Sequence, residues 1–509
     1  MTTDFFDRMA KPRFLGFVLI AAVVLGAYSF MLRAPFRSMD DAPTIVDNPI
    51  IRDVTNIPKV LTGSFFGDHS YYRPLVTMSF MAEYHAFGFD PFWFNLDNVI
   101  LHILNSFLVF VLIRRLWSDR TTAFWAGLLF AIHPIQWEAV SNISGRAILL
   151  NAFFVFSAFY FFLEFYQRRR MSLLLGSVLC FVLALLCKES AAILPVVLIL
   201  YMTFFPKEER KPWFAVAPFF LGLFGFIIFR HQLGINQLFG WGSWDALVLG
   251  FLSFARGVIT YLRLFIFPVD LYFDRSRMVF GDFFDPQLTI TIFFWLTAFF
   301  LLWKYRRAIN GRRMFLVFWF LVELAPVSQI VTSLGVQPGF ISLAEHFLYV
   351  PSAAMFTALV LGGRHLWDWN QKKKMCSPAI AAAGLGGFLV FLFLTTIQQT
   401  VYASNELSML KRSVLMQPYN SRVQYSLGMN YVNRGMFQTA ENYFRQATAI
   451  DPWNIRAQIA LGKALCDQGR YEDGIAVYRS IRDAGSFESI LRENLRLSIE
   501  LLGDHKKPQ

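Results

Sequence analysis

The stretch that decides the fold runs from residue 147 to residue 205 and reads AILLNAFFVFSAFYFFLEFYQRRRMSLLLGSVLCFVLALLCKESAAILPVVLILYMTFF. It contains three apolar runs, 147–166, 171–187 and 190–205, which are separated only by a basic QRRR and by a lysine-glutamate pair. A helix needs about 20 apolar residues to cross a bilayer. The stretch therefore predicts three successive transmembrane helices joined by short turns.

Comparable apolar runs lie on both sides of this stretch. Hydrophobic residues make up 56% of the 509-residue chain and charged residues only 16%, whereas about a quarter of a soluble domain is charged. This composition predicts an all-α polytopic membrane protein with about eleven transmembrane helices. The expected spans are 14–33, 93–113, 122–135, 147–166, 171–187, 190–205, 213–230, 288–303, 314–334, 348–367 and 378–400.

The first apolar run follows three basic residues, Arg8, Lys11 and Arg13. It is longer than the core of a signal peptide and lacks a clear small-residue cleavage site, so we interpret it as a retained first span. Two of the four cysteines lie in one apolar run. No disulfide framework is therefore indicated.

Short basic loops predict the orientation of the spans, because lysine and arginine are retained on the cytoplasmic side. They place the N-terminus in the cytoplasm and the C-terminal region on the exoplasmic side, and they also explain the net charge of +12 without a nucleic-acid partner. A crossing by residues 249–268 would upset this alternation, and Arg256 and Arg263 lie inside that segment. We expect a re-entrant or interfacial helix there. The basic loops are Arg114-Arg115, 167–170, 207–211, 304–313 and 372–374.

The first exoplasmic loop, 34–92, is too long for a turn. Its amphipathic stretches 54–66 and 74–87 are expected to form helices along the membrane surface. Together with this loop, residues 1–400 are expected to form a transmembrane domain, and residues 401–509 a second, exoplasmic domain.

The second domain shows a repeat with the 34-residue period of the tetratricopeptide repeat (TPR), a helix pair in which small residues let the helices approach closely. Such a domain binds a partner, or it caps and spaces the chain. One unit matches the pattern well, a second matches less well, and Pro418 marks half a unit before them. The matching residues are Leu427-Gly428, Tyr431, Gly435, Phe437, Ala440, Phe444, Ala447 and Pro452, then Leu461-Gly462, Leu465, Gly469, Tyr471, Gly474 and Tyr478.

Two adjacent carboxylates, Asp40 and Asp41, follow the first span by a few residues. A pair of carboxylates at the membrane surface is suited to general-base catalysis or to binding a divalent cation. The alternative is a solvated pair in a loop.

Cationic side chains gather on or near the predicted exoplasmic side, against the usual charge bias. A charge at a span end is retained at a free-energy cost unless it is paired, so such groups commonly hold something anionic. The alternatives are a self-neutralising pair for Lys188 and Glu189, and an Arg146 whose side chain reaches from a span start to the interface. The cations are Arg73, Arg146, Lys188, Arg256, Arg275, Arg277 and His346.

Two histidines, His102 and His133, lie within or at the end of a span and are more often hydrogen-bonded structural residues than ligands. Motifs of zinc hydrolases, P-loop nucleotide enzymes and serine hydrolases are absent from the sequence. An acidic pair, a group of cations and a membrane-embedded body together suit a substrate with a phosphate at the headgroup level and a lipid tail. The residues alone do not name the reaction.

In their order along the chain, these motifs resemble those of the transmembrane-and-TPR O-mannosyltransferase-like proteins, which are GT-C glycosyltransferases. The resemblance covers nearly the whole chain. It departs from the family pattern at Ile148, where many relatives have an acidic residue, and at His346, where an arginine is common; a histidine is cationic only when protonated. The motifs are Asp40-Asp41 with Asn48-Pro49, Tyr72-Arg73-Pro74-Leu75, Asn98-Val99-Ile100-Leu101-His102, His133-Pro134-Ile135 with Glu138-Ala139-Val140 and Gly145-Arg146, Lys188-Glu189, and Glu345-His346-Phe347-Leu348-Tyr349-Val350-Pro351-Ser352.

The resemblance implies an enzyme of the GT-C fold that moves a mannose-type monosaccharide from a polyprenyl-phosphate donor to a hydroxyl acceptor, on the exoplasmic face and with inversion. Asp40 is the first choice for the base, and Asp41 would support it or bind a divalent cation such as Mg²⁺ or Mn²⁺. Cationic groups would stabilise the leaving phosphate. The implied donor-binding residues are Arg73, Arg146, Lys188, Glu189, Arg256 and His346, and further candidates are His102, His133 and Glu138.

The expected partners are the bilayer, a polyprenyl-phosphate-linked sugar, and a protein or glycan acceptor that the TPR domain would present. Two other classes stay open: a non-catalytic scaffold whose TPR domain recruits exoplasmic proteins, and a transporter of lipid-linked sugars. A transporter would call for inverted repeats and charges near the bilayer midplane. We expect a bacterial inner membrane, with the endoplasmic reticulum as the alternative.

Overall fold

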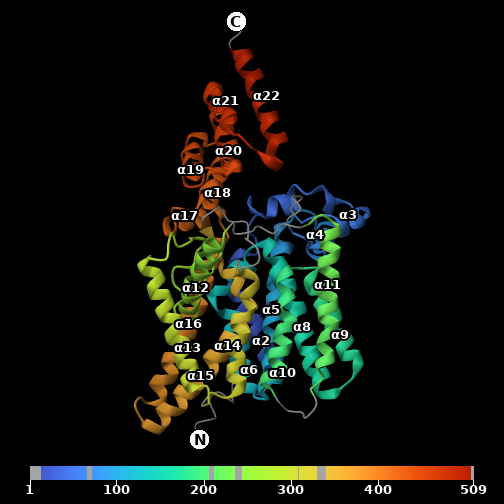
Figure 1. Cartoon of the computed structure of the whole chain (residues 1–509), viewed down its shortest axis with the longest axis vertical. Coiled ribbons are helices and arrows are strands. Elements are labelled where there is room, and N and C mark those ends of the chain that lie inside the picture. Colours follow the sequence, from blue (N-terminus) through green and yellow to red (C-terminus); the bar gives the residue numbers. More distant parts are fainter. Residues whose placement is uncertain are drawn as a thin grey trace.

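The chain forms a bundle of long helices with a smaller stack of helices standing on one end (Figure 1). The computed structural model describes residues 13–65, 71–205, 211–235, 243–307, 309–328 and 340–505. The stack begins with α17 (Glu406–Met416) and ends with α22 (Glu488–His505). We call the end of the bundle that carries this stack the TPR side.

A helix lies at each of the eleven expected spans. Six described segments are long and apolar enough to cross a membrane: Pro91–Trp117, Ile143–Arg168, Trp213–Gln232, Trp244–Ile266, Pro286–Tyr305 and Pro378–Ala403. The chain is therefore a mostly helical, polytopic membrane protein, and the count of eleven crossings stays a prediction. The helices at the expected spans are α2 (Arg13–Tyr28), α5 (Pro91–Trp117), α6 (Arg120–Ile132), α8 (Arg146–Arg168), α9 (Met171–Leu185), α10 (Leu194–Phe204), α11 (Ala217–Gln232), α13 (Pro286–Tyr305), α14 (Gly311–Glu323), α15 (Ser352–Lys373) and α16 (Pro378–Ala403).

Parts of several expected features lie outside the described residues. They include Arg8 and Lys11 before the first span, Phe66 at the end of the amphipathic stretch 54–66, residues 207–210 and 308 of two basic loops, residues 329–334 at the end of the span expected at 314–334, and residues 506–509 at the end of the second domain.

Polar caps and small residues explain how the bundle packs. Asp119 begins α6 by accepting hydrogen bonds from the backbone N–H groups of Thr121 and Thr122 (3.1 and 3.3 Å), which would otherwise lack a partner at a helix start. Within α6, Gly127 faces α5, and an added Cβ would lie 3.1 Å from the Cβ of Phe110. The absence of a side chain lets these two helices approach closely.

Helix α12 (Trp244–Ile266) corresponds to the expected re-entrant or interfacial helix. Tyr72 of the first loop packs against Phe226 and Phe229, so α11 ends on the TPR side. After α12, the hydroxyl of Tyr272 donates to Gln417 of the helix stack (3.2 Å). The end of α11 and the loop after α12 thus both lie on the TPR side, which fits an interfacial helix, although the length and composition of α12 would allow a crossing.

The first outer loop forms a small layer with its own core on the TPR side. Helix α4 (Pro74–Phe87) coincides with an expected amphipathic helix, whereas the other is split into η4 (Val54–Asn56) and α3 (Ile57–Thr62). The layer also contains η2 (Ala42–Val46) and η3 (Pro49–Arg52). Its buried core consists of Ile45, Ile51, Val60, Phe65, Val76, Phe80, Met81, Phe94, Ile143, Ala147 and Cys187.

The expected all-α class has one small exception. Strand β1 (Arg277–Met278) pairs antiparallel with β2 (Phe340–Ile341), so that Arg277 lies opposite Ile341. This short ladder joins the loop after α12 to the segment before η10 (Glu345–Leu348).

The helix stack has the arrangement that the 34-residue period predicts. Its helices are α17, α18 (Ser421–Val432), α19 (Phe437–Ile450), α20 (Ile455–Cys466), α21 (Tyr471–Ser480) and α22, with η11 (Gly485–Phe487) between the last two. An added Cβ at Gly428 would lie 2.5 Å from the ring of Phe444. Gly435 ends the first pair's turn in the left-handed region, with φ at 71°.

Candidate active site

The acidic pair lies in the loop that follows α2. The carboxylate of Asp41 is held there by two hydrogen bonds from backbone N–H groups. Its oxygens accept from the N–H groups of Arg37 (2.9 Å) and Ser144 (3.0 Å). The Asp41 side chain is buried. Burial raises its pKa to about 6, although the charge and the amide of Arg37 act in the opposite direction. Asp41 therefore fastens the loop to the segment before α8.

Arg37, which the sequence patterns did not single out, fastens the same loop to two further segments. Its guanidinium is buried and donates through Nη2 to the carbonyl oxygens of Ser141 (2.5 Å) and Ala403 (3.1 Å). The pKa of Arg37 is lowered by burial, and Asp41 partly compensates. Its position just before the acidic pair is the only sequence signal that could have found it.

Asp40, in contrast, has a half-buried carboxylate with no hydrogen-bond partner in the part of the chain that the structure describes. Only its backbone oxygen is engaged, by the hydroxyl of Thr44 (2.5 Å). The charge of Asp40 acts on Arg37, Arg73 and Arg422. The structure thus separates the two aspartates into one that holds the loop and one whose carboxylate bonds no described group.

Arg73 precedes α4 and forms an ion pair with Glu189, at 2.9 Å between Nη2 and Oε1. Its guanidinium lies over the ring of Tyr71, 4.5 Å from the centroid. Burial lowers the pKa of Arg73, but the charge and hydrogen bond of Glu189 outweigh this and raise it. Arg73 is therefore a fixed cation beside Asp40.

Lys188 lies in the turn between α9 and η7 (Glu189–Ile193). Its Nζ is 5.8 Å from the centroid of the Phe347 ring, and no described residue gives it a hydrogen bond or an ion pair within 4 Å. Burial and the charge of Arg73 lower the pKa of Lys188 to about 8, against the charges of Glu189 and Glu138. A Lys188–Glu189 ion pair, the alternative that the sequence left open, is not formed, because Glu189 binds Arg73 instead.

Glu138 and His346 form a second pair in this region. The Nδ1 of His346 is 3.0 Å from Oε1 of Glu138, and the backbone N–H of His346 donates to Oε2 (3.0 Å). Glu138 lies on α7 (Trp137–Val140) and is buried, and its charge acts on Lys188 and Arg422. His346 is therefore held by a carboxylate, and it is partly exposed on its other side.

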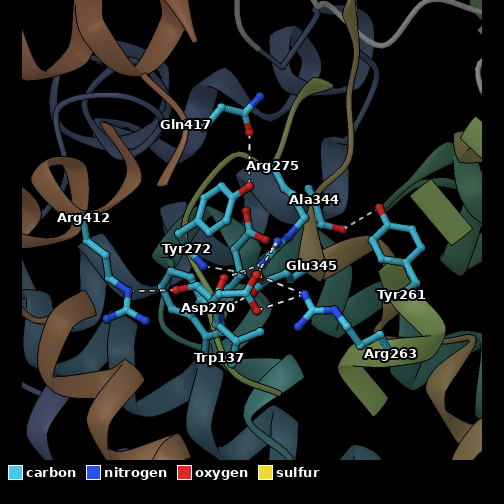
Figure 2. A network of polar contacts seen from close by, with 12 residues as sticks. Trp137, Tyr261, Arg263, Asp270, Tyr272, Arg275, Ala344, Glu345, Arg412 and Gln417 are labelled. Atoms are coloured by element: carbon cyan, nitrogen blue, oxygen red, sulfur yellow. Dashed lines mark hydrogen bonds and ion pairs between the residues drawn. The ribbon is translucent and has the colours of Figure 1, made fainter. Parts of the chain in front are cut away.

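A closed network lies beside these residues, around Glu345 (Figure 2). Nη2 of Arg275 lies 2.7 Å from Oε1 of Glu345, which also accepts from the backbone N–H of Tyr272 (3.2 Å), while Oε2 accepts from the indole N–H of Trp137. Burial raises the pKa of Glu345 to about 7, although Arg275 acts against this. The network fixes the loop after α12 against η10.

The same loop is held from the opposite side by the helix stack (Figure 2). Nε of Arg412 donates to the carbonyl of Leu271 (2.9 Å), and Gln417 accepts from Tyr272. Beyond them, the amide of Asn420 donates to the carbonyl of Asp274 (3.2 Å). The TPR domain is thus bonded directly to the loop that carries Arg275.

Arg422 is the TPR residue whose charge interacts with members of a group of charged residues described above. We call this group the cluster: Asp40, Arg73, Glu138, Lys188 and His346. Its Nε lies 3.5 Å from Oδ2 of Asp274, and 39% of its side chain is exposed. The pKa of Arg422 is raised by Asp274 first and, more weakly, by Asp40, Tyr71 and Glu138. No pattern in the transmembrane sequence could predict a cation supplied from the repeat domain.

Arg146 lies in a closed environment of its own. It is buried, and it donates to Asn98 (2.6 Å), to Glu83 (2.8 Å) and to the carbonyl of Phe94 (2.9 Å). These contacts tie α8 to α4 and α5. Its guanidinium thus faces the protein interior rather than the interface, and a role in phosphate binding stays a prediction.

The other sequence candidates are not brought to the cluster by any described contact. Arg256 contacts Gln287 (3.0 Å) and the carbonyl of Met278 (2.6 Å). His102 bonds Tyr349 (2.8 Å) and the carbonyl of Ala131 (3.1 Å), and His133 bonds the carbonyl of Phe265 (3.2 Å). Both histidines have the surroundings of hydrogen-bonded structural residues.

A metal ligand set is not preassembled within the described ranges, where no three Asp, Glu, His or Cys side chains gather closely enough to hold an ion. Asp41 already accepts two amide hydrogen bonds, so Asp40 has the freer carboxylate for a ligand. Binding of a divalent cation by this pair stays a prediction.

Comparison with known proteins adds an independent line of evidence. Residues 73–233 match the family described as dolichyl-phosphate-mannose-protein mannosyltransferase, and residues 431–489 match a tetratricopeptide repeat family. The chain is 33% identical over 159 residues to protein O-mannosyl-transferase TMTC3 of Mus musculus, which is 30% of this chain and 17% of the relative. It is 26% identical over 498 residues to protein O-mannosyl-transferase TMTC1 of Homo sapiens, covering 84% and 54%.

The chain spans less than two thirds of the length of these relatives. Among solved structures, it resembles ArnT from Cupriavidus metallidurans bound to undecaprenyl phosphate, with 14% identity, coverage of 91% of this chain and 79% of that chain, and a TM-score of 0.42. A mannosyltransferase match in the transmembrane part is followed by a repeat match in the helix stack. The chain is thus similar to the transmembrane-and-TPR O-mannosyltransferase-like proteins in both of its parts, as its motifs predict.

Proposed function

We propose that the chain is a GT-C glycosyltransferase that moves a mannose-type sugar from a polyprenyl-phosphate donor to a hydroxyl of a protein or glycan. One observation carries this proposal. On the TPR side, the carboxylate of Asp40 and the ammonium of Lys188 have no hydrogen-bond partner among the described residues. Arg73, Glu138 and Arg422 lie close enough for their charges to interact with one or both of them. A free carboxylate among cations suits acid–base chemistry on an anionic substrate.

In the proposed reaction, Asp40 takes the proton of the acceptor hydroxyl as its oxygen attacks the anomeric carbon. A bond forms between that oxygen and the carbon, and the bond between the carbon and the phosphate oxygen breaks. Attack from the face opposite the phosphate inverts the anomeric configuration. Asp41, Arg37 and Ser144 would keep Asp40 in place, because the loop cannot shift without breaking their buried hydrogen bonds.

The leaving group is a lipid phosphate monoester, whose growing charge requires positive groups nearby. Lys188 is the first candidate, since no described residue gives its ammonium a hydrogen bond or an ion pair and its contact is with the ring of Phe347. Arg73 and Arg422 are cations at the same site. His346, whose Nδ1 lies 3.0 Å from the carboxylate of Glu138, would contribute when it carries a charge.

The location of the site supports an exoplasmic reaction. Helices α3 and α4 of the first outer loop lie at the same end of the bundle as the TPR domain (Figure 1), and the basic loops predict that this side is exoplasmic. We therefore assign residues 1–400 to the catalytic transmembrane domain and 401–509 to an exoplasmic TPR domain, in a bacterial inner membrane. The names of the relatives, protein O-mannosyl-transferases, support the choice of sugar.

The test is transfer of radiolabelled mannose from polyprenyl phosphate in membranes that contain the chain. Wild type, Asp40→Asn and Asp47→Asn are compared at equal expression. Asp47 is an exposed carboxylate in the same loop and serves as the matched control. We expect label to enter protein or glycan with wild type and with Asp47→Asn, and not with Asp40→Asn.

Equal transfer by Asp40→Asn and wild type would overturn the assignment of the base. If wild type and both variants transfer no sugar while the TPR domain still captures exoplasmic proteins, the chain would be a non-catalytic scaffold. Export of intact lipid-linked sugar without transfer would support the transporter.

A further inference from the structure

One edge of the helix stack carries a row of aromatic residues. Tyr419, Trp453 and Phe487 follow one another at intervals of 34 residues, each at the turn that begins a new helix pair. Tyr419 and Trp453 are 69% and 77% exposed, whereas Phe487 is partly buried against the core that contains Tyr478. The amide of Asn454 donates to the hydroxyl of Ser421 (2.8 Å), so the first two turns lie side by side.

Arginines alternate with these aromatic rings. Arg422 and Arg456 lie three residues after Tyr419 and Trp453, again 34 residues apart. The guanidinium of Arg456 lies over the ring of Phe487, 5.1 Å from its centroid. We call these five residues the aromatic edge.

The aromatic edge begins beside the proposed active site. Its first turn is bonded to the loop after α12, since Gln417 accepts from Tyr272 and Asn420 donates to Asp274. That loop is fixed against Glu345 by Arg275 (Figure 2). From there the helix stack extends away from the bundle (Figure 1), so the edge leads from solution to the cluster around Asp40.

We propose that the aromatic edge binds an extended acceptor polypeptide rich in acidic side chains and leads its hydroxyl groups to the active site. This inference rests on the proposed function. Sites spread along consecutive turns are reached together by a chain that runs along them, rather than by a compact ligand. Two arginines in line favour negative partners by charge complementarity, and exposed tyrosine and tryptophan supply contact area at a small loss of conformational entropy.

The test measures binding alone and needs no sugar transfer. The full chain in detergent is titrated against a fluorescent 20-residue peptide of alternating Glu, Ser and Thr, and against the same peptide with Gln for Glu. We expect the acidic peptide to bind more tightly and to be weakened by salt. Trp453→Ala and Arg456→Ala should each weaken it by at least about ten-fold.

The matched controls lie on the opposite edge of the stack, in the turn between α18 and α19. Arg434→Ala and Met436→Ala remove an exposed cation and an exposed apolar side chain there, and we expect unchanged peptide affinity. Arg456→Glu is a second, independent variant. It should reject the acidic peptide and bind a Lys-for-Glu peptide better than wild type does, which a merely unfolded protein could not do.

Equal affinity of wild type and Trp453→Ala, or equal binding of the Glu and Gln peptides, would overturn the inference. So would a change of oligomeric state in Trp453→Ala, since the edge would then be an interface between two copies of the chain. If the chain binds the acidic peptide tightly but transfers no sugar, peptide binding by the aromatic edge would stand and the proposed transferase function would be rejected.

Discussion

Two neighbouring groups of charges on the TPR side differ in how completely they are paired. Around Glu345, every partner is a protein group: Arg275, Trp137 and the backbone of Tyr272 use its two oxygens, and Glu345 and Arg275 are almost fully buried. Asp40 and Lys188 lie in the second group, half-buried and without such partners among the described residues.

The difference distinguishes charged residues with a structural role from charged residues that are available to a substrate. A buried ion pair that is held by further protein groups keeps loops in place, because removing one partner leaves an uncompensated charge. A half-buried charge without a partner is instead available to a substrate. By this criterion Arg146 and Glu83 belong with the closed network, although the sequence places Arg146 among the candidate ligands.

The largest effect on transfer is expected at Asp40, because its carboxylate has no described partner. Asp40→Asn removes the base from the acceptor hydroxyl, and loss of a general base lowers the rate by about 100- to 10,000-fold. The fold should be unaffected, since this carboxylate bonds no described residue. The measurement is kcat for transfer, with the melting temperature in detergent as the control; a large fall in melting temperature would contradict this view of Asp40.

Arg275 should behave in the opposite way. Arg275→Met leaves Glu345 as an unpaired buried charge and should lower the free energy of unfolding by about 3–5 kcal/mol. The double variant Arg275→Met/Glu345→Gln should recover part of this loss, because no buried charge is left. Denaturation of the purified protein measures both. A double variant less stable than the single one would show that the network is held together by something other than charge.

Lys188 should affect donor binding and catalysis together. Lys188→Met is expected to lower transfer by about 100- to 1,000-fold, as for loss of one stabilising donor, while Lys188→Arg should keep part of the activity. Burial and Arg73 lower the pKa of Lys188 to about 8, so its charged form is lost as the pH rises through 8. Transfer by wild type should therefore fall above this pH, and a profile that stays unchanged in Lys188→Arg would exclude Lys188 as the titrating group.

Asp41 should give the smallest effect. Asp41→Asn can accept one of the two amide hydrogen bonds but not both, and loss of a hydrogen bond to a charged group costs about 1.5–3 kcal/mol. We expect a lower melting temperature with transfer still measurable. If Asp41→Asn abolished transfer at unchanged stability, the two aspartates would have to exchange roles.

Much of the fold can be predicted from the sequence, because apolar runs and the 34-residue period are local signals. Loop charges and the position of Arg256 and Arg263 also predict an interfacial placement of α12, which stays a prediction because this helix is long and apolar enough to cross. In the TPR domain, Gly428 sits where the close helix contact with Phe444 requires it. Each of these features is encoded within a few tens of residues.

The pairing within the site is not local and could not be predicted. Lys188 and Glu189 are adjacent, so a mutual ion pair is the simplest expectation, yet Glu189 binds Arg73, 116 residues away. Arg422 and Arg37 likewise gain their roles from segments brought together only by the fold. The acidic pair is visible in the sequence, but only the amides of Arg37 and Ser144 distinguish Asp41 from Asp40.

The most direct test of the account measures donor binding and transfer in the same two purified variants. Polyprenyl phosphate is titrated into wild type, Asp40→Asn and Lys188→Met, and transfer of labelled mannose is followed in parallel. We predict that Asp40→Asn binds the lipid like wild type and transfers no sugar, while Lys188→Met binds it weakly. Transfer by Asp40→Asn at the wild-type rate would contradict the central claim that this free carboxylate is the catalytic base.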